Sequence, residues 1–201
     1  MEQNLLFTGV GGQGVILAAK VVGEAATAAG HETRVGEIHG MSQRGGSVVA
    51  HVRYGNRVYG PMVPEGKANV VVALEPMEAL RYANYLKPGG LFLVNFEPEM
   101  PFPVEQGEAE YPDEAEIREA LEARGRLVEV PALELATEAG IPKGANAVLL
   151  GALSTEYDLG LDVEQIREAL LELVPDDARE SNRDAFELGR EGQDPRVETR
   201  S

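Results

Sequence analysis

Apolar residues follow two different periods in the first 130 residues of the chain. Short continuous apolar runs, typical of buried strands, alternate with segments in which small apolar residues recur every three or four positions, as in helices. Residues 69–74 (NVVVAL) are rich in β-branched side chains and predict a central strand covered on both faces. The predicted strands are 4–10, 31–38, 47–54, 69–74, 91–96 and 127–130, and the predicted helices are 13–29, 76–87 and 113–124.

One region breaks this alternation. After the second predicted strand, residues 39–46 (HGMSQRGG) form a polar loop with glycines where a helix would be expected. The next segment, residues 47–54, alternates with period 2, and Gly55-Asn56 is a turn pair that would lead back into Val58 and Tyr59. We therefore predict an inserted β-hairpin.

From Pro131 onward the pattern is helical only, with predicted helices at 132–139, 146–157, 162–174 and 176–190. Asp113, Asp162 and Asp176 are expected to cap helices at their N-termini. The predicted fold is α/β, a mostly parallel sheet flanked by helices in a Rossmann- or flavodoxin-like sandwich, with the inserted hairpin and a helical C-terminal extension. We expect one domain over residues 1–190 and a polar tail over 191–201.

The amino-acid composition excludes several kinds of site and partner for this chain. The 201 residues include no cysteine, which excludes disulfides, a thiol nucleophile and a cysteine-held iron–sulfur cluster in this chain. The formal net charge of −16 argues against nucleic acid and acidic lipid as partners. We see no secretory signal and no apolar run near the roughly 18 residues of a membrane span, so we expect a soluble cytoplasmic protein.

The charge is unevenly distributed. Residues 1–64 carry 4 acidic and 5 basic side chains, whereas the remainder carries 30 acidic and 13 basic ones, giving nets of +1 and −17. An anionic small molecule would therefore be tolerated best by the N-terminal part.

That part contains a glycine fingerprint. Gly9, Gly11 and Gly14 fit G-x-G-x-x-G between a predicted strand and a predicted helix, where free N–H groups and the helix dipole attract a phosphate. The alternative is that the glycines only allow the strand and helix to pack closely. If the ligand were NAD, Glu37, 23 residues after Gly14, would be the acid that binds the ribose, a loose match to the usual spacing of about 20.

A second glycine segment follows at Gln43-Arg44-Gly45-Gly46. Arginine presents a planar fork of donors suited to phosphate or carboxylate, and the glycines allow close approach of the backbone. His39 and Ser42 lie nearby in sequence, but this spacing is weak grounds for a catalytic serine. We interpret His51, on an alternating strand, as structural, and the three separated histidines do not indicate a metal site.

Five segments together resemble a known family, the gamma domain of the 2-oxoacid:ferredoxin oxidoreductases. They are GVGGQGVILAAKVVGEAA, GEIHGMSQRGGSVVAHVRYG, ALEPMEALRYANYLKPGG, ANAVLLGAL and ESNRDAFELGR. The match runs in order from about Leu5 to Arg190, and HGMSQRGGSV is most similar to the beta subunit of the indolepyruvate enzymes. In the last segment, we interpret Asn182, Ala185, Phe186 and Gly189 as helix packing or subunit docking.

The resemblance implies a subunit of an enzyme that converts a 2-oxoacid to an acyl-CoA on thiamine diphosphate and passes electrons through iron–sulfur clusters to ferredoxin. Thiamine diphosphate, Mg and the clusters would belong to a larger catalytic subunit, because this chain has neither cysteines nor an acidic magnesium-diphosphate motif. By resemblance, Gly11, Gly12, Gln13 and Gly14 would approach the phosphates of coenzyme A, and Gln43 and Arg44 would clamp them.

Three hypotheses of function remain open at this point. The first is the oxidoreductase subunit, inactive by itself, with indolepyruvate as substrate or alternatively pyruvate, 2-oxoglutarate or a branched-chain 2-oxoacid. The second is a free-standing NAD-dependent oxidoreductase, and the third is a non-enzymatic docking module.

Overall fold

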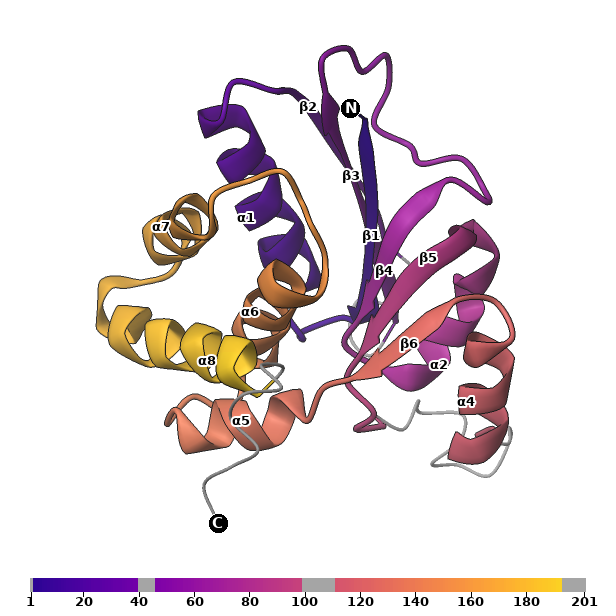
Figure 1. The fold of residues 1–201 in the computed structure, drawn as a ribbon. Helices are drawn as coiled ribbons and strands as arrows, with labels where there is room; N and C mark the ends of the chain where they lie inside the picture. The colour runs from indigo at the N-terminus through magenta and orange to yellow at the C-terminus, as the bar shows by residue number, and fades with distance from the viewer. Residues whose placement is uncertain (1, 40–45, 99–110, 193–201) are drawn as a thin grey trace.

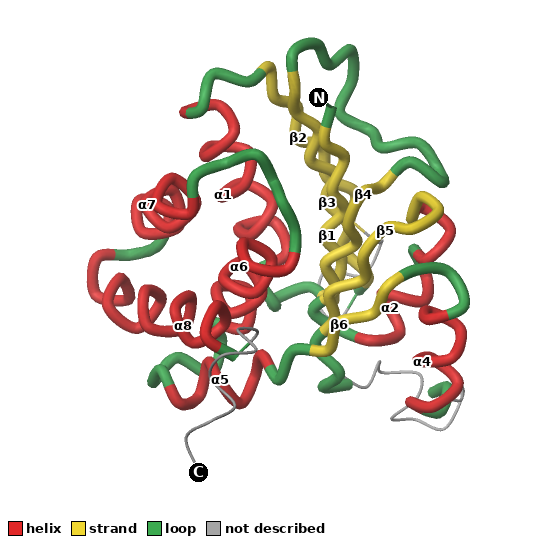
Figure 2. The backbone as a smooth tube through the Cα atoms, viewed as in Figure 1, coloured by secondary structure: helices red, strands yellow, loops and turns green. Residues whose placement is uncertain are grey.

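A computed structural model describes residues 2–39, 46–98 and 111–192 of the chain. A six-stranded sheet stands at the centre, with helices on both faces (Figures 1 and 2). The strands are β1 (Gln3–Val10), β2 (Glu32–His39), β3 (Ser47–Gly55), β4 (Ala68–Ala73), β5 (Leu86–Val94) and β6 (Arg126–Glu129). The helices are α1 (Val15–Ala28), α2 (Pro76–Arg81), α4 (Glu114–Glu122), α5 (Ala132–Glu138), α6 (Ala145–Glu156), α7 (Val163–Leu173) and α8 (Arg179–Glu191), with short 3-10 turns η1 (Ala83–Tyr85) and η2 (Asp176–Ala178).

The strand order is β2-β3-β1-β4-β5-β6. Strands β1, β4, β5 and β6 are mutually parallel, whereas β3 runs antiparallel to both β1 and β2. The predicted mostly parallel α/β sheet is therefore confirmed, with β3 as the reversed strand.

Alternating side chains of the sheet build two apolar cores. Leu5 and Phe7 of β1 pack into the core beneath α1 and α5–α8, whereas Leu6 faces the smaller core beneath α2 and α4. The side chains of β4 and β5 divide in the same way, as expected of strands covered on both faces. Figure 1 shows that the C-terminal helices form the layer on one face of the sheet, together with α1.

Helices α6 and α8 cross at two glycines. A Cβ on Gly151 would lie 2.0 Å from the carbonyl oxygen of Phe186, and one on Gly189 would lie 2.0 Å from that of Val148. Phe186 is fully buried. The C-terminal segment of the family resemblance thus packs helices, with Phe186 as an anchor of the core.

The inserted hairpin differs from the prediction. Strand β2 pairs along its whole length with β3, from Glu32↔Gly55 to His39↔Val48, and residues 57–60 form no strand. Arg53 donates hydrogen bonds to the carbonyl oxygens of Gly60 (3.0 Å) and Met62 (3.1 Å). These bonds hold the segment after β3 by a side chain, and the segment does not pair with β3 as a strand. The prediction that Gly55-Asn56 turns the chain into a strand at Val58 and Tyr59 is wrong.

The predicted helix 76–87 ends early, at Arg81. Strand β5 already begins at Leu86, so Pro88-Gly89-Gly90 lie within it, at a shift of register between Ala68↔Leu86 and Val70↔Leu91. A Cβ on Gly90 would lie 2.6 Å from the Leu86 side chain, so the glycine allows this irregularity. These residues shift the register of the β4–β5 pairing and do not stop a helix.

Two of the three predicted N-caps are confirmed. The side chains of Asp113 and Asp162 accept hydrogen bonds from backbone N–H groups in the first turns of α4 and α7. Asp176 instead opens the 3-10 turn η2 and forms an ion pair with Arg179 at 3.0 Å, and α8 begins without a side-chain cap. The prediction for Asp176 is wrong because the 3-10 turn precedes the helix.

Candidate functional site

The candidate site lies at the carboxyl edge of the parallel strands. Since β1, β4, β5 and β6 point the same way, the segments that follow them meet at one edge of the sheet. The chain leaves β1 toward β2 on one side, whereas β4 lies on the other, so β1 and β4 form a switch point of the topology. Ligands of open α/β sheets bind at such a point.

The first glycine turn connects β1 to α1. Gly12 and Gly14 have φ values of +109° and +83°, which glycine adopts without strain. The N–H groups of Gly11 and Gln13 are already bonded, to the carbonyl oxygens of Gly46 (2.9 Å) and Val10 (3.2 Å). An anion at this turn would therefore be met by the N–H groups of Gly12, Gly14 and the first turn of α1.

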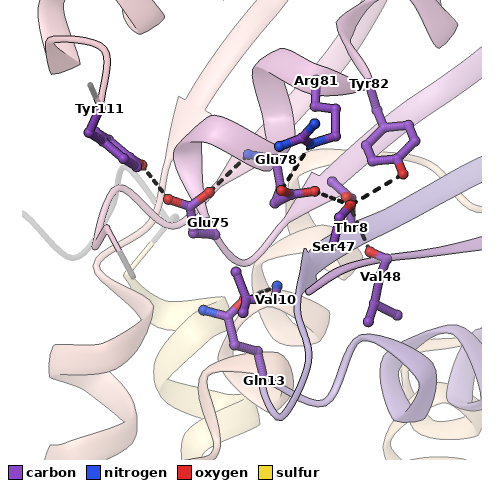
Figure 3. Close-up of polar contacts among 10 residues, drawn as sticks. All are labelled: Thr8, Val10, Gln13, Ser47, Val48, Glu75, Glu78, Arg81, Tyr82 and Tyr111. Carbon is purple, nitrogen blue, oxygen red and sulfur yellow. Dashed lines mark hydrogen bonds and ion pairs between the residues drawn. The ribbon is translucent and has the colours of Figure 1, made fainter. Parts of the chain in front are cut away.

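The Gln13 side chain turns inward (Figure 3). Its Oε1 accepts a hydrogen bond from the Val10 N–H (2.7 Å), and its Nε2 donates one to the carbonyl oxygen of Leu74 (3.4 Å). The amide thus ties the glycine turn to the end of β4. Of the predicted site residues in the described part, Gln13 supports the turn through its side chain, while the glycines line it.

A cleft of about 510 Å³ opens beside this turn. Gly11, Gly12 and Gln13 line it on one side and Lys143 and Ala145 on another, while Asn95 and Glu97 follow β5. The Asn95 side chain forms its hydrogen bonds within the protein: it donates to the carbonyl oxygen of Leu74 (3.2 Å) and accepts from the Ala132 N–H (3.1 Å). Lys143 was missed by sequence reasoning, although a lysine two residues before a helix that has no acidic residue in its first turn is a recognisable pattern.

Two buried glutamates lie at the same edge, after β4 (Figure 3). Glu75 is 1% and Glu78 5% exposed. Glu75 caps α2 by accepting from the Glu78 N–H (2.9 Å) and also accepts a hydrogen bond from the Tyr111 hydroxyl. Burial raises the pKa of the Glu75 carboxyl, and the Tyr111 hydroxyl opposes this rise by stabilising the ionised form.

The second glutamate holds the start of β3. The Ser47 hydroxyl donates to Glu78 at 2.5 Å, and Arg81 forms an ion pair with the same carboxylate at 3.1 Å. Sequence reasoning passed over both glutamates. The signal for Glu75 was its position just after a buried strand, where a charged side chain must find partners; Glu78 follows in the first turn of α2.

Gln43 and Arg44 lie outside the described residues, as does Ser42. The described part of the chain resumes at Gly46, and its first two residues contact the edge: Gly46 accepts the Gly11 hydrogen bond, and Ser47 contacts Glu78. The second glycine segment therefore ends beside the first.

His51 is fully buried and its Nδ1 accepts a hydrogen bond from the Val63 N–H (3.2 Å). Burial lowers the pKa of its imidazole, so a neutral structural histidine fits, as predicted. Within residues 2–39, 46–98 and 111–192, no group of three or more His, Cys, Asp or Glu side chains could hold a metal ion. The helices of these residues are also too short or too polar to cross a membrane.

The geometry disfavours a dinucleotide site. In dinucleotide-binding Rossmann folds, the acidic residue that binds the ribose lies at the end of a strand adjacent to β1. Here β3 separates β2 from β1, so Glu37 lies two strand spacings, about 10 Å, from the strand that carries the glycines.

A glycine turn at the switch point of a mostly parallel sheet, with a cleft at the carboxyl edge, defines a doubly wound α/β protein. The chain belongs to the pyruvate ferredoxin/flavodoxin oxidoreductase family, whose family model matches residues 4–192. It is 49% identical over 190 residues to indolepyruvate oxidoreductase subunit IorB of Pyrococcus horikoshii, covering 94% of each chain. The family resemblance is therefore confirmed.

Solved structures share the fold. The gamma subunit of a keto/oxoacid ferredoxin oxidoreductase from Geobacter sulfurreducens matches with a TM-score of 0.69 and 26% identity, over 94% of this chain and 96% of that one. A 2-oxoglutarate:ferredoxin oxidoreductase from Magnetococcus marinus, with 2-oxoglutarate, coenzyme A and succinyl-CoA bound, matches with a TM-score of 0.72 and 20% identity. There the match covers 94% of this chain and 30% of that one, so this fold is one part of a longer polypeptide.

Proposed function

We propose that the chain is the small subunit of a thiamine-diphosphate-dependent 2-oxoacid:ferredoxin oxidoreductase of the indolepyruvate type. The observation that carries this proposal is the 49% identity to an indolepyruvate oxidoreductase subunit over 94% of both chains. The complex would oxidise a 2-oxoacid to carbon dioxide and an acyl-CoA, with the two electrons passing to ferredoxin.

The partner would supply the redox and decarboxylation chemistry. Iron–sulfur clusters need thiolate ligands, and this chain has no cysteine, so its residues do not fit a cluster. Thiamine diphosphate, Mg and the clusters are therefore assigned to a larger, cysteine-bearing subunit. Purification of the native complex and identification of the companion chain tests this assignment; iron or turnover in the isolated chain would contradict it.

The contribution of this chain would be to bind coenzyme A and complete the active site. Gly11, Gly12 and Gly14 place a turn without side chains at the switch point, and α1 begins there with no acidic residue in its first turn. The partial positive charge of the helix start then favours a phosphate. In this proposal Gln13 keeps the turn in shape, while Gln43 and Arg44 clamp the phosphates.

The Arg44→Ala substitution tests the clamp in the assembled enzyme. Loss of a charge-assisted contact of about 1.5–3 kcal/mol would raise the Michaelis constant for coenzyme A roughly ten- to hundredfold. The turnover number at saturating coenzyme A and the Michaelis constant for the 2-oxoacid should change little. An unchanged Michaelis constant for coenzyme A would refute the clamp.

The substrate is tested by competition. With indolepyruvate, pyruvate, 2-oxoglutarate and a branched-chain 2-oxoacid offered to the same complex, indolepyruvate should have the highest kcat/KM. Another preferred acid would overturn the substrate and leave the subunit role intact.

The other two hypotheses have separate tests. An NAD enzyme predicts saturable NAD binding by the lone chain that is lost in Gly11→Val, and calorimetry at millimolar NAD decides this. A pure docking module predicts that variants of neither glycine segment change catalysis by the complex.

A further inference from the structure

We infer that Ser47 and Glu78 are a positioning pair for the ligand site at the first glycine turn. Neither residue lines the cleft beside that turn, so neither is assigned a contact with the ligand. Their hydrogen bond instead fixes the place of the turn relative to the end of β4. The identity of the ligand, coenzyme A, rests on the proposed function, whereas the role of the pair rests on the contacts that follow.

Two consecutive residues at the start of β3 are held from the two sides of the switch point. The carbonyl oxygen of Gly46 accepts a hydrogen bond of 2.9 Å from the Gly11 N–H, in the turn after β1. The Ser47 hydroxyl donates at 2.5 Å to Glu78 of α2, the helix that follows β4. Because β1 and β4 are the strands of the switch point, this short segment connects the turn after one strand to the helix after the other.

A second connection closes a ring of contacts around the switch point (Figure 3). The Gln13 side chain donates to the carbonyl oxygen of Leu74 at 3.4 Å and so ties the same glycine turn to the end of β4. The next residue, Glu75, accepts a hydrogen bond of 2.9 Å from the Glu78 N–H as the N-cap of α2. The turn is therefore held to the β4–α2 junction at two places, and breaking the Ser47–Glu78 bond leaves only one.

The carboxylate of Glu78 is costly to bury. Glu78 is 5% exposed, whereas the side chain of its ion-pair partner, Arg81, remains 49% exposed to water. Burial raises the pKa of the neighbouring Glu75 carboxyl, and the negative charge of Glu78 adds to the rise. Apolar side chains can replace a buried ion pair with little loss of stability, so stability alone does not account for a carboxylate here. Such costs are typical of functional sites.

The Ser47 hydroxyl uses both its donor and its acceptor at this junction. Its single proton goes to Glu78, so the Tyr82 hydroxyl is the donor in the 3.3 Å contact between Tyr82 and Ser47. Both partners belong to α2 or to the residue that ends it. The link thus depends on a hydroxyl group at position 47 and on an oxygen acceptor at position 78.

The first test compares Ser47→Thr with Ser47→Val in the enzyme assembled with its larger subunit. The two variants have the same shape and differ only in the hydroxyl group. Ser47→Thr should keep the Michaelis constant for coenzyme A within about twofold, and Ser47→Val should raise it about fivefold or more. The turnover number and the Michaelis constant for the 2-oxoacid should stay within about twofold for both variants. A fall in turnover, or equal changes in both Michaelis constants, would indicate a general structural effect and overturn the inference.

Thr8→Val is the matched control. The Thr8 hydroxyl is buried and donates to the carbonyl oxygen of Val48 (3.3 Å), within the same β1–β3 pair of strands. Its loss should lower the midpoint of thermal unfolding by an amount similar to that for Ser47→Val, yet leave the Michaelis constant for coenzyme A unchanged. A similar rise in this constant for Thr8→Val would mean that any weakening of these strands has the effect, and the pair would have no special role.

Glu78 is tested by a second comparison. Glu78→Gln keeps an oxygen that can accept from the Ser47 hydroxyl, whereas Glu78→Leu does not. Glu78→Leu should therefore reproduce the effect of Ser47→Val, and Glu78→Gln should have little effect on the Michaelis constant for coenzyme A. The double variant Ser47→Val/Glu78→Leu should raise this constant no further than the stronger single variant, because both changes break the same link. Multiplication of the two single effects would show independent roles and contradict the pair.

Arg44→Ala distinguishes a failure of the pair from a failure of the proposed coenzyme A site. If Arg44→Ala raises the Michaelis constant for coenzyme A and Ser47→Val does not, the pair is wrong and the proposed site survives. If Ser47→Val raises it and Arg44→Ala does not, the pair stands and the clamp is wrong. If neither variant has an effect, both fail.

Discussion

The N–H of Gly11 donates a hydrogen bond of 2.9 Å to the carbonyl oxygen of Gly46. This bond joins the two glycine segments, which are separated by a helix and a strand in the sequence. It exists because β3 runs antiparallel to β1, so that β3 begins where β1 ends, with Val10 opposite Ser47. The reversed strand thus delivers the end of the second glycine segment to the first.

Gly14 is expected to be the least replaceable residue of the turn. An alanine there would hold a left-handed φ of +83° and also collide with the buried Asn146 amide. Gly30 is a matched control, with φ +85° and no atom within 4 Å of a new Cβ. Urea unfolding should show a loss of about 1 kcal/mol for Gly30→Ala and about 2–3 kcal/mol for Gly14→Ala. Equal losses of unfolding free energy would show that the Asn146 side chain moves away from the new methyl group at no cost.

Tyr111→Phe should destabilise the protein in a pH-dependent manner. The hydroxyl donates to the Glu75 carboxyl group and stabilises its ionised form, whereas burial raises the pKa of that group above its ordinary value of 4.5. Without this donor the pKa rises further, so the penalty of keeping Glu75 ionised in the fold increases. The loss, about 1–2 kcal/mol, should be complete above the raised pKa and should shrink as the pH falls through it.

Tyr54→Phe is the control for that experiment. The Tyr54 hydroxyl is buried too, but it donates to the backbone carbonyl of Leu159 at 2.8 Å, which has no charge to titrate. Its removal should cost a similar free energy of unfolding that stays constant between pH 4.5 and 8. A loss for Tyr111→Phe that is equally constant would contradict an ionised Glu75 at neutral pH.

Local patterns predicted most of the elements because their information lies within a few residues. The β-branched run that became β4 and the caps at Asp113 and Asp162 required only neighbouring positions. The pairing of β3 with β2 was missed because Gly55-Asn56 has a good local turn signal, and only the distant bonds from Arg53 oppose it. Pro88-Gly89-Gly90 was misread for the same reason: a helix stop and a bulge have the same composition.

The candidate site was predicted in part. The glycine turn was found because its constraint is on the backbone and therefore appears in the sequence as glycine. The inward direction of Gln13 depends on Leu74, 61 residues away, and Lys143 reaches the cleft only through the packing of α6. Such long-range contacts leave no local pattern.

The α6–α8 crossing provides a test of close helix packing. Alanine is favoured over glycine inside a helix by about 1 kcal/mol, so packing decides the sign of each substitution. Gly189→Ala would place a Cβ 2.0 Å from a backbone oxygen of Val148, which cannot move aside without separating the helices. Gly23→Ala in α1 meets side chains only, with Cγ2 of Val35 at 2.7 Å and that of Thr33 at 3.9 Å, and Val35 is 40% exposed, so relief requires a local shift in β2 and no separation of two helices. Urea unfolding should show a loss of about 3 kcal/mol for Gly189→Ala and a clearly smaller loss for Gly23→Ala. A neutral Gly189→Ala would mean that the two helices pack less closely than described.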